Sequence, residues 1–257
     1  MRDLFEEIHA DLARHDPVER AKELSRRELP KRFYTEVAVA ETDGGFAVTL
    51  DGRQVKTPAR KPFLLPSRPL AEAAAAEWAA QESVINPGLM PLTRLANAAI
   101  DAVSQRFAEV ADEIARYAGN DALCYRAEEP ERLAERQRLT WDPLLEAASG
   151  LLGHRFRLAG GVLHVAQDPA LTAAYRALVG TVSPLELAAL HTVTTITGSA
   201  VLALLLARGV STPDQIWAAA HVDEDWNAEL WGEDAEASRI RAYKRQEFDA
   251  ATLILRG

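Results

Sequence analysis

The spacing of apolar residues changes near residue 69, and that change constrains the fold more than any other feature. In residues 32–66 apolar side chains recur at every second position, interrupted by the turns Asp43-Gly44-Gly45 and Asp51-Gly52. Alternation with Gly-containing turns predicts an antiparallel β-meander. Beyond residue 69, segments such as 70–83 and 92–117 have the composition and periodicity of helices. We therefore predict an α+β fold, with a small N-terminal antiparallel β-containing domain followed by a larger, mainly α-helical domain.

Local start and stop signals divide the chain into three predicted parts. These are an N-terminal helical extension (1–30), a β-containing domain with helices (31–118) and a mainly helical C-terminal domain (119–257). Pro30 and Gly119-Asn120 mark the boundaries. Within the last part, Asp142-Pro143, Ser183-Pro184 and Thr212-Pro213 each place a capping residue before proline and predict a helix start.

Residues 154–166 read as two short extended pieces around Gly160-Gly161. This hairpin would bring His154 and His164 opposite each other. A surface pair is the favoured interpretation, because no carboxylate or cysteine lies nearby in the sequence to complete a metal site.

One apolar run, Leu187–Ala207, has no formal charge and is long enough to span a bilayer. It contains His191 and four threonines, and it lacks aromatic belts and a basic flank. We predict a buried core helix, with His191 hydrogen-bonded inside it, and no stable membrane insertion.

Net charge and cysteine content exclude some partners and compartments. The charge of −9 argues against a nucleic-acid partner, which would require clustered Lys and Arg, whereas a basic protein is compatible with it. The single cysteine, Cys124, suits a reducing compartment. The first residues mix acids with bases and resemble no secretory signal. We expect a bacterial cytoplasmic monomer, although a processed organellar protein would look similar.

Motifs for catalysis and cofactor binding are missing from the sequence. It has no phosphate loop, no GxSxG elbow, no His-Glu-x-x-His motif and no dinucleotide-binding glycine triplet. Cys124 has no neighbouring histidine to activate it, so a packed small residue is the favoured interpretation. We therefore expect no enzyme activity, no cofactor and no metal.

The segment 217–236 (WAAAHVDEDWNAELWGEDAE) is the strongest candidate for a functional surface. It holds three tryptophans and seven acids, and no Lys or Arg. Aromatic anchors beside charge are typical of recognition surfaces. On one continuous helix, Ala219, Val222, Trp226 and Leu230 would face the core, whereas Trp217, Glu224 and Trp231 would form a separate outward stripe.

Two other interpretations of this acidic segment stay open. It could be a solvated helix face without a partner. Alternatively, Asp223, Glu224 and Asp225 could serve a small-molecule or metal-dependent hydrolase, which predicts a pocket gathering these acids with His221 or His191. Against the second, three consecutive helical residues diverge by about 100° each.

Co-linear blocks covering about residues 32–238 resemble the ATP12 family, the assembly chaperones of the F1 part of ATP synthase. They are RFYTEVAVAE, LDGRQVKTPARKPFLLPS, LAEAAAAEWAAQESVINPGLMPLTRLANAAID, DALCYRAEEPERLAERQ with WDPLL, TGSAVLALLLARG and AAHVDEDWNAELWGEDAEA. None is a catalytic fingerprint, but their order along the chain is specific.

The resemblance implies a non-enzymatic chaperone that binds the free F1 α subunit before it pairs with β, prevents its aggregation and leaves the finished enzyme. Related eukaryotic proteins act in the mitochondrial matrix. The family's functional acid falls in the stretch that here reads Trp231-Gly232-Glu233-Asp234-Ala235-Glu236, without singling out one residue. We expect the following residues to bind the partner: Trp217, Glu224, Glu229, Trp231, Glu233, Asp234 and Glu236. A generic acidic interaction scaffold remains an alternative.

Overall fold

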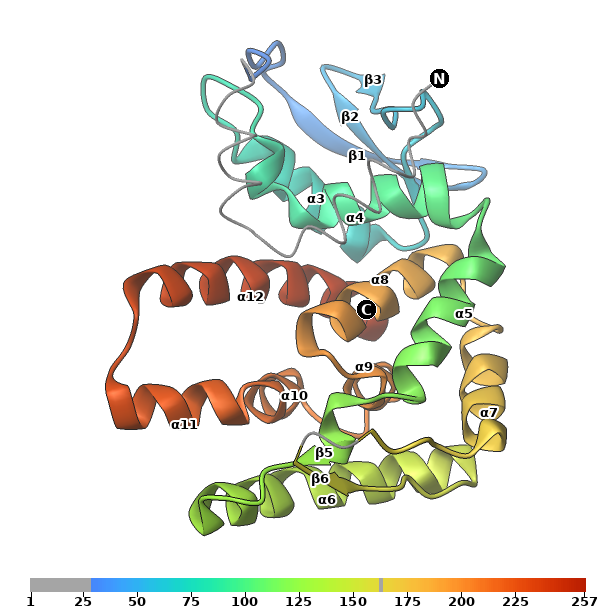
Figure 1. Ribbon diagram of the computed structural model, residues 1–257. Coiled ribbons are helices and arrows are strands. Elements are labelled where there is room, and N and C mark those ends of the chain that lie inside the picture. The colour runs from blue at the N-terminus through green and yellow to red at the C-terminus, as the bar shows by residue number, and fades with distance from the viewer. Residues whose placement is uncertain (1–28, 162–163) are drawn as a thin grey trace, which may run out of the picture. The chain divides into compact units, whose positions relative to one another are not determined.

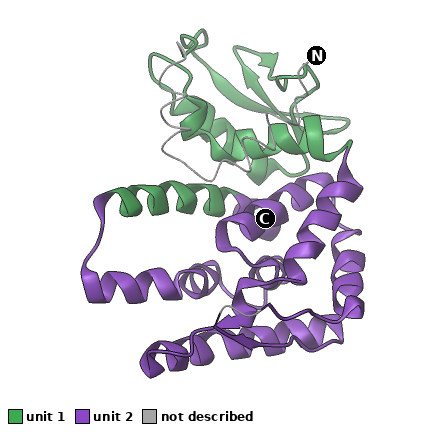
Figure 2. Cartoon of the chain, in the orientation of Figure 1, with its two compact units in different colours: residues 1–105, 236–250, 257 green, residues 106–235, 251–256 purple. Residues whose placement is uncertain are grey.

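The computed structural model describes residues 29–161 and 164–257, so the predicted N-terminal helical extension lies outside the described residues. These residues belong to two compact units (Figure 2). Unit 1 contains residues up to 105 together with 236–250 and 257, and unit 2 contains 106–235 and 251–256. The domain boundaries at 30/31 and 118/119 stay predictions.

Unit 1 is built on a small antiparallel sheet, as predicted. Strand β1 (Val37–Thr42) pairs with β2 (Gly45–Leu50), which also pairs with β3 (Arg53–Gln54) and β4 (Leu64–Leu65). The β2–β3 turn is Asp51-Gly52, with φ of 47° and 76°. Asp and Gly accept this left-handed backbone most readily, which explains why the sequence revealed the hairpin.

The β1–β2 connection requires glycine for a different reason. Gly45 has a φ of 130°, and a Cβ atom there would lie 2.6 Å from the carbonyl oxygen of Leu65 in β4. The absence of a side chain therefore allows β4 to pair with β2.

Helices cover this sheet. Helix α3 (Arg68–Ala79) packs on β1, β2 and β4 with Leu70, Ala71 and Ala74 buried (Figure 1). The Glu77 carboxylate at its end accepts hydrogen bonds from the amides of Leu92 and Thr93, in the first turn of α4 (Pro91–Ala98). A short 3-10 turn, η1 (Pro87–Leu89), connects the two helices.

The single long helix predicted over 92–117 is wrong. After α4 the chain makes a π-helical turn, η2 (Ala99–Val103), and then a break, before α5 (Phe107–Ala118) begins. The π turn directs the buried Asp101 carboxylate onto the hydroxyl of Thr57 (2.6 Å) and the amide of Ala59 (3.0 Å). These tertiary bonds compete with regular helix geometry, and local periodicity carries no sign of them.

Unit 2 is mainly helical, which with the sheet of unit 1 confirms the α+β prediction. Its elements are α5, the turn η3 (Ala122–Cys124), α6 (Glu131–Leu152), α7 (Pro169–Val179), α8 (Pro184–Thr197), α9 (Ala200–Ala207), α10 (Pro213–Ala220) and α11 (Val222–Trp231). The last helix, α12 (Ala235–Arg256), contributes residues 236–250 to unit 1 and 251–256 to unit 2. The helix starts predicted at Ser183 and Thr212 are confirmed as the starts of α8 and α10, and each is formed by a capping box.

Two local predictions in unit 2 are wrong. Pro143 lies inside α6 rather than at a helix start, since the helix already begins at Glu131. Pro143 is exposed, as is Leu139 one turn before it, so water can reach the carbonyl that proline leaves without a donor.

Residues 154–166 form no hairpin among the described positions. Instead β6 (Ala159–Gly160) pairs in parallel with β5 (Tyr125–Arg126), and the His164 ring lies 3.0 Å from the Tyr125 hydroxyl.

The apolar run 187–207 is buried as predicted, but it forms two helices. Gly198, with a φ of 66°, ends α8, and Ser199 caps α9. Helix α9 packs against α5, α6, α8 and α10, and its residues 200–206 are all buried (Figure 1). His191 is buried in α8 with its Nε2 atom 3.6 Å from a carboxylate oxygen of Glu113. Across the described ranges, no helix combines the length and the apolarity that a membrane span requires.

The break between α8 and α9 is held by a buried carboxylate. Asp121 accepts hydrogen bonds from the Ser199 hydroxyl (2.7 Å) and from the amides of Val201 (2.9 Å) and Leu123 (3.1 Å). Burial raises its pKa to about 6, against the opposing effect of these donors. The first turn of the most buried helix thus depends on one side chain distant in sequence.

We predict that Asp121→Ala lowers the free energy of unfolding by roughly 3 kcal/mol, because it leaves buried donors unpaired. Since the folded pKa exceeds the unfolded value, this carboxyl contributes most below about pH 4, and its contribution falls as the pH rises through about 6. The difference between wild type and variant in urea unfolding should therefore be larger at about pH 5 than at about pH 8. Glu146→Ala, at an exposed position on α6, is the control, and an equal loss in both variants would contradict this role.

Candidate functional site

The acidic segment 217–236 does not form one helix. Helix α10 ends at Ala220 and α11 begins at Val222, with His221 (φ −116°, ψ 20°) between them. The His221 ring stacks on the Trp217 ring at a centroid distance of 4.1 Å, and its Nδ1 atom lies 2.7 Å from the Trp217 carbonyl oxygen. The helical register therefore restarts at Val222.

Two residues of the segment lie elsewhere than predicted. Trp217, expected on an outward stripe with Glu224 and Trp231, is 8% exposed and belongs to the core of unit 2. As placed, it offers almost no surface to a partner. Leu230, expected to face the core, is 56% exposed. The prediction for Trp217 extended one helical period through His221, where the helix in fact stops. Leu230 keeps the register of the buried Val222 but lies in the last turn of α11, where it is exposed.

Two acids of the segment fasten α11 onto α6. Glu229 forms an ion pair with Arg136, with 2.7 Å between Oε1 and Nη1. The Asp223 carboxylate accepts a hydrogen bond of 2.7 Å from the Nε2 atom of Gln137. The buried Gln137 in turn accepts a hydrogen bond from the Ala127 amide (2.8 Å). Asp223 and Glu229 thus have structural partners within the chain.

The side of α11 that carries Glu224, Asn227 and Trp231 is exposed and, with the end of the helix, forms the candidate site. We define the α11 tip as Glu224, Asn227, Leu230, Trp231 and Glu233, all of which are exposed. Glu224, Asn227 and Trp231 follow the spacing i, i+3, i+7 and so share one helix face. Trp231 is 85% exposed, and Gly232 (φ 87°) ends the helix directly after it.

The remaining acids of the segment differ in whether they already interact with other residues of the chain. Asp234 and Glu236 are exposed but have interactions within the chain. Glu224 and Glu233 are the exposed acids of the α11 tip, on either side of Trp231. Asn227 and Leu230 were missed as surface residues. The spacing from Glu224 would have identified Asn227, whereas the exposure of Leu230 depends on its place in the last turn of α11.

The α11 tip has the chemistry of a recognition surface. An indole ring and a leucine side chain in water cost free energy that burial against a partner would recover. A cationic side chain could lie over the Trp231 ring while it pairs with a neighbouring carboxylate. Within the described residues, no group of three or more His, Cys, Asp or Glu side chains could hold a metal ion.

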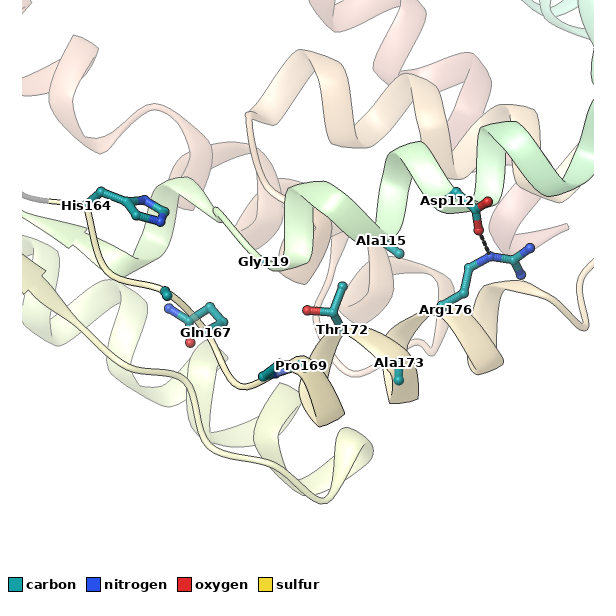
Figure 3. A pocket seen from close by; sticks show the side chains of 10 residues that line it. Asp112, Ala115, Gly119, His164, Gln167, Pro169, Thr172, Ala173 and Arg176 are labelled. Atoms are coloured by element: carbon teal, nitrogen blue, oxygen red, sulfur yellow. Dashed lines mark hydrogen bonds and ion pairs between the residues drawn. The ribbon is translucent and has the colours of Figure 1, made fainter.

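The hydrolase alternative predicts a pocket that gathers the acids of the segment, and the hollow found in unit 2 is lined by other residues. A hollow of about 560 Å³ in unit 2 lies along α5 and α7 (Figure 3). Small side chains such as Ala115, Thr172 and Ala173 line it, with the Asp112–Arg176 ion pair at one end and His164 at the other. Asp223, Glu224 and Asp225 do not line this hollow, and neither do His191 and His221.

Cys124 is a packed residue, as predicted. It is fully buried, and burial together with the neighbouring Asp121 carboxylate raises the pKa of its thiol to about 12. A thiol with such a pKa is almost entirely protonated near neutral pH, which does not suit a nucleophile.

Comparison with known proteins agrees with the resemblance seen in the sequence. The family model described as ATP12 chaperone protein matches residues 31–149. The crystal structure of Atp12 from Paracoccus denitrificans is 39% identical, covers 88% of this chain and 97% of its own, and superposes with a TM-score of 0.81. The Atu1473 protein of Agrobacterium tumefaciens is 46% identical, with 99% and 96% covered and a TM-score of 0.85.

A more distant relative extends the comparison to a eukaryote. The Schizosaccharomyces pombe protein named atp12, mitochondrial, is 24% identical over 223 residues, which is 82% of this chain and 76% of that protein. The chain matches the two bacterial proteins over nearly their full length. It therefore belongs to the ATP12 family, chaperones of ATP synthase assembly.

Proposed function

We propose that this chain binds the free α subunit of F1 through the α11 tip and keeps it soluble until it pairs with β. The observation that supports this most strongly is that Trp231 and Leu230 are exposed between two exposed acids, Glu224 and Glu233, in a chain of a chaperone family. The proposed activity is binding without turnover, in the cytoplasm of a bacterial cell.

The physical task fits such a surface. A subunit that awaits its partner exposes an interface that is apolar at its centre, and such patches aggregate. A tip with an indole, a leucine and acids could cover an apolar patch with a basic rim. Because no ATP-driven step is invoked, the β subunit must displace the chaperone by binding α more tightly.

The acids of the segment differ in their contacts, and this difference determines which of them can be substituted to test the proposal. Asp223 and Glu229 hold the helix on α6, so substituting them would disturb the position of the tip as well as its charge. Glu224 and Glu233 can be changed with less effect on the fold. The solved structure of an aspartate-to-lysine mutant of the P. denitrificans Atp12p superposes on this chain with a TM-score of 0.81. A charge reversal in that relative is therefore compatible with the family fold.

The direct test is co-expression of the chain with the cognate F1 α subunit, followed by affinity capture and a solubility assay. The proposal predicts a stoichiometric soluble complex that added β subunit dissociates. Capture of unrelated basic proteins to the same extent would favour the generic scaffold instead. Aggregation of α with nothing captured would refute the proposal.

We predict that Glu224→Lys and Glu233→Lys together weaken capture of the α subunit by roughly 30-fold, because like charges would meet at the interface. Binding should be measured by interferometry on immobilised chaperone, with thermal unfolding to show that the fold is intact. Glu146→Lys, an equal charge change on the exposed face of α6, is the control. Equal capture by all variants would remove the α11 tip from the interface.

We also predict that Trp231→Ala protects the α subunit from aggregation less effectively than wild type does. It should bind the α subunit roughly 30-fold more weakly, as expected when an aromatic hot spot is truncated. Its stability should change little, since the ring is 85% exposed. Leu139→Ala, which removes an exposed apolar side chain from α6, should protect the α subunit as well as wild type. Equal losses in the two variants would indicate that exposed apolar area in general, rather than the tip, determines capture.

A further inference from the structure

A second surface, in unit 1, is not used by the proposed function. A groove of about 500 Å³ is lined by residues that precede β1, by the β2–β3 hairpin and by the end of α3. Its lining residues are Phe33, Leu50, Asp51, Arg53, Gln54, Val55, Lys56 and Trp78. The groove therefore has apolar walls and a charged rim.

The apolar wall of the groove is fixed in place. Phe33 is 73% exposed, and its ring meets the Tyr34 ring edge-on at 5.3 Å. Tyr34 is buried, donates a hydrogen bond to the Trp78 carbonyl (2.8 Å), and has the Arg32 guanidinium 4.7 Å from its ring centroid. An exposed phenyl ring on such a rigid base is preorganised for contact, which lowers the entropic cost of binding.

The charged side chains at the rim of the groove differ in whether they already have partners within the chain. The Asp51 carboxylate accepts hydrogen bonds from the Thr35 amide (3.0 Å), the Thr35 hydroxyl (3.0 Å) and the Glu36 amide (2.8 Å). These bonds hold its pKa below the usual range, with the Glu36 amide contributing most. Arg53 and Lys56 are exposed, and over the ranges the structure describes neither forms an ion pair. In the described part of the chain, the groove thus presents two cationic side chains without an ion pair, Arg53 and Lys56, beside an exposed aromatic ring. The net charge of the chain as a whole is −9.

We propose that this groove binds an extended segment of the client protein that carries acidic residues next to apolar ones. A carboxylate would lie near Arg53 and Lys56, and an apolar side chain would contact Phe33. Charge complementarity excludes a basic segment, which would meet both cations. The chaperone would then contact its client with surfaces of opposite charge on its two units. This inference does not depend on which client surface the α11 tip binds.

The test measures binding of a fluorescein-labelled peptide of alternating glutamate and leucine to the full chain by anisotropy. Matched peptides replace glutamate by lysine or by glutamine. The acidic peptide should bind at least about tenfold more tightly than either, and its affinity should fall as salt increases. Equal binding of the three peptides would overturn the proposal.

Variants locate the site. Arg53→Glu and Lys56→Glu should each weaken binding of the acidic peptide about tenfold or more, and Phe33→Ala should do so as well. Arg60→Glu is the matched control, because Arg60 is an exposed cation of unit 1 that does not line the groove, and it should change affinity less than about twofold. Equal effects of Arg53→Glu, Lys56→Glu and Arg60→Glu would show a general charge effect and contradict the groove.

A tip variant separates this inference from the proposed function. Glu224→Lys should keep full affinity for the acidic peptide even if it loses the α subunit. Loss of peptide binding in Glu224→Lys, with normal binding in Arg53→Glu, would place the peptide elsewhere and refute the groove. If Glu224→Lys captured the α subunit normally, this result would contradict the proposed role of the α11 tip but not the groove.

Discussion

The hydrogen bonds of the buried Asp121 carboxylate are the constraint on which the architecture of unit 2 depends. They let an apolar run turn at Gly198 and continue as α9, whose first-turn amides would otherwise be unpaired in the core. Helix α9 is the centre against which α5, α6, α8 and α10 pack. Trp141 of α6 donates a hydrogen bond to the Ala219 carbonyl of α10 (2.8 Å), and this contact fixes the helix that leads to α11. The position of the α11 tip thus follows from the core.

From this core, α11 extends with one side bound and one side exposed. Gln137 and Arg136 of α6 bind Asp223 and Glu229, and another side of α11 presents Glu224 and Trp231. Leu230 is exposed in the last turn of the helix. An acidic helix with polar anchors on one side can expose apolar side chains on the other without refolding around them. In unit 1, by contrast, Arg53 and Lys56 beside Phe33 give a groove of opposite charge. Both surfaces combine an exposed ring with charges, which is a composition suited to binding proteins.

Features set by neighbouring residues could be predicted from the sequence, whereas features set by distant ones could not. The Asp51-Gly52 turn and the helix starts at Ser183 and Thr212 depend on residues within a few positions, and all three are confirmed. The breaks after Val103 and at His221 contain no proline, and they depend on the Asp101–Thr57 bond and the Trp217–His221 stack. The burial of Trp217 relative to Glu224 follows from the second break, whereas Leu230 is exposed because it lies in the last turn of α11. The composition of 217–236 did indicate a recognition surface, but not which side chains face outward.

Hydrogen–deuterium exchange on the complex with the F1 α subunit tests the central claim most directly. Amides of residues 224–233, in α11 and directly after it, should exchange more slowly in the complex than in the free chain. Amides on the exposed side of α6 around Glu146 should not change. A stable complex that leaves 224–233 unprotected would show that the α subunit binds elsewhere, and would contradict the assignment of the α11 tip.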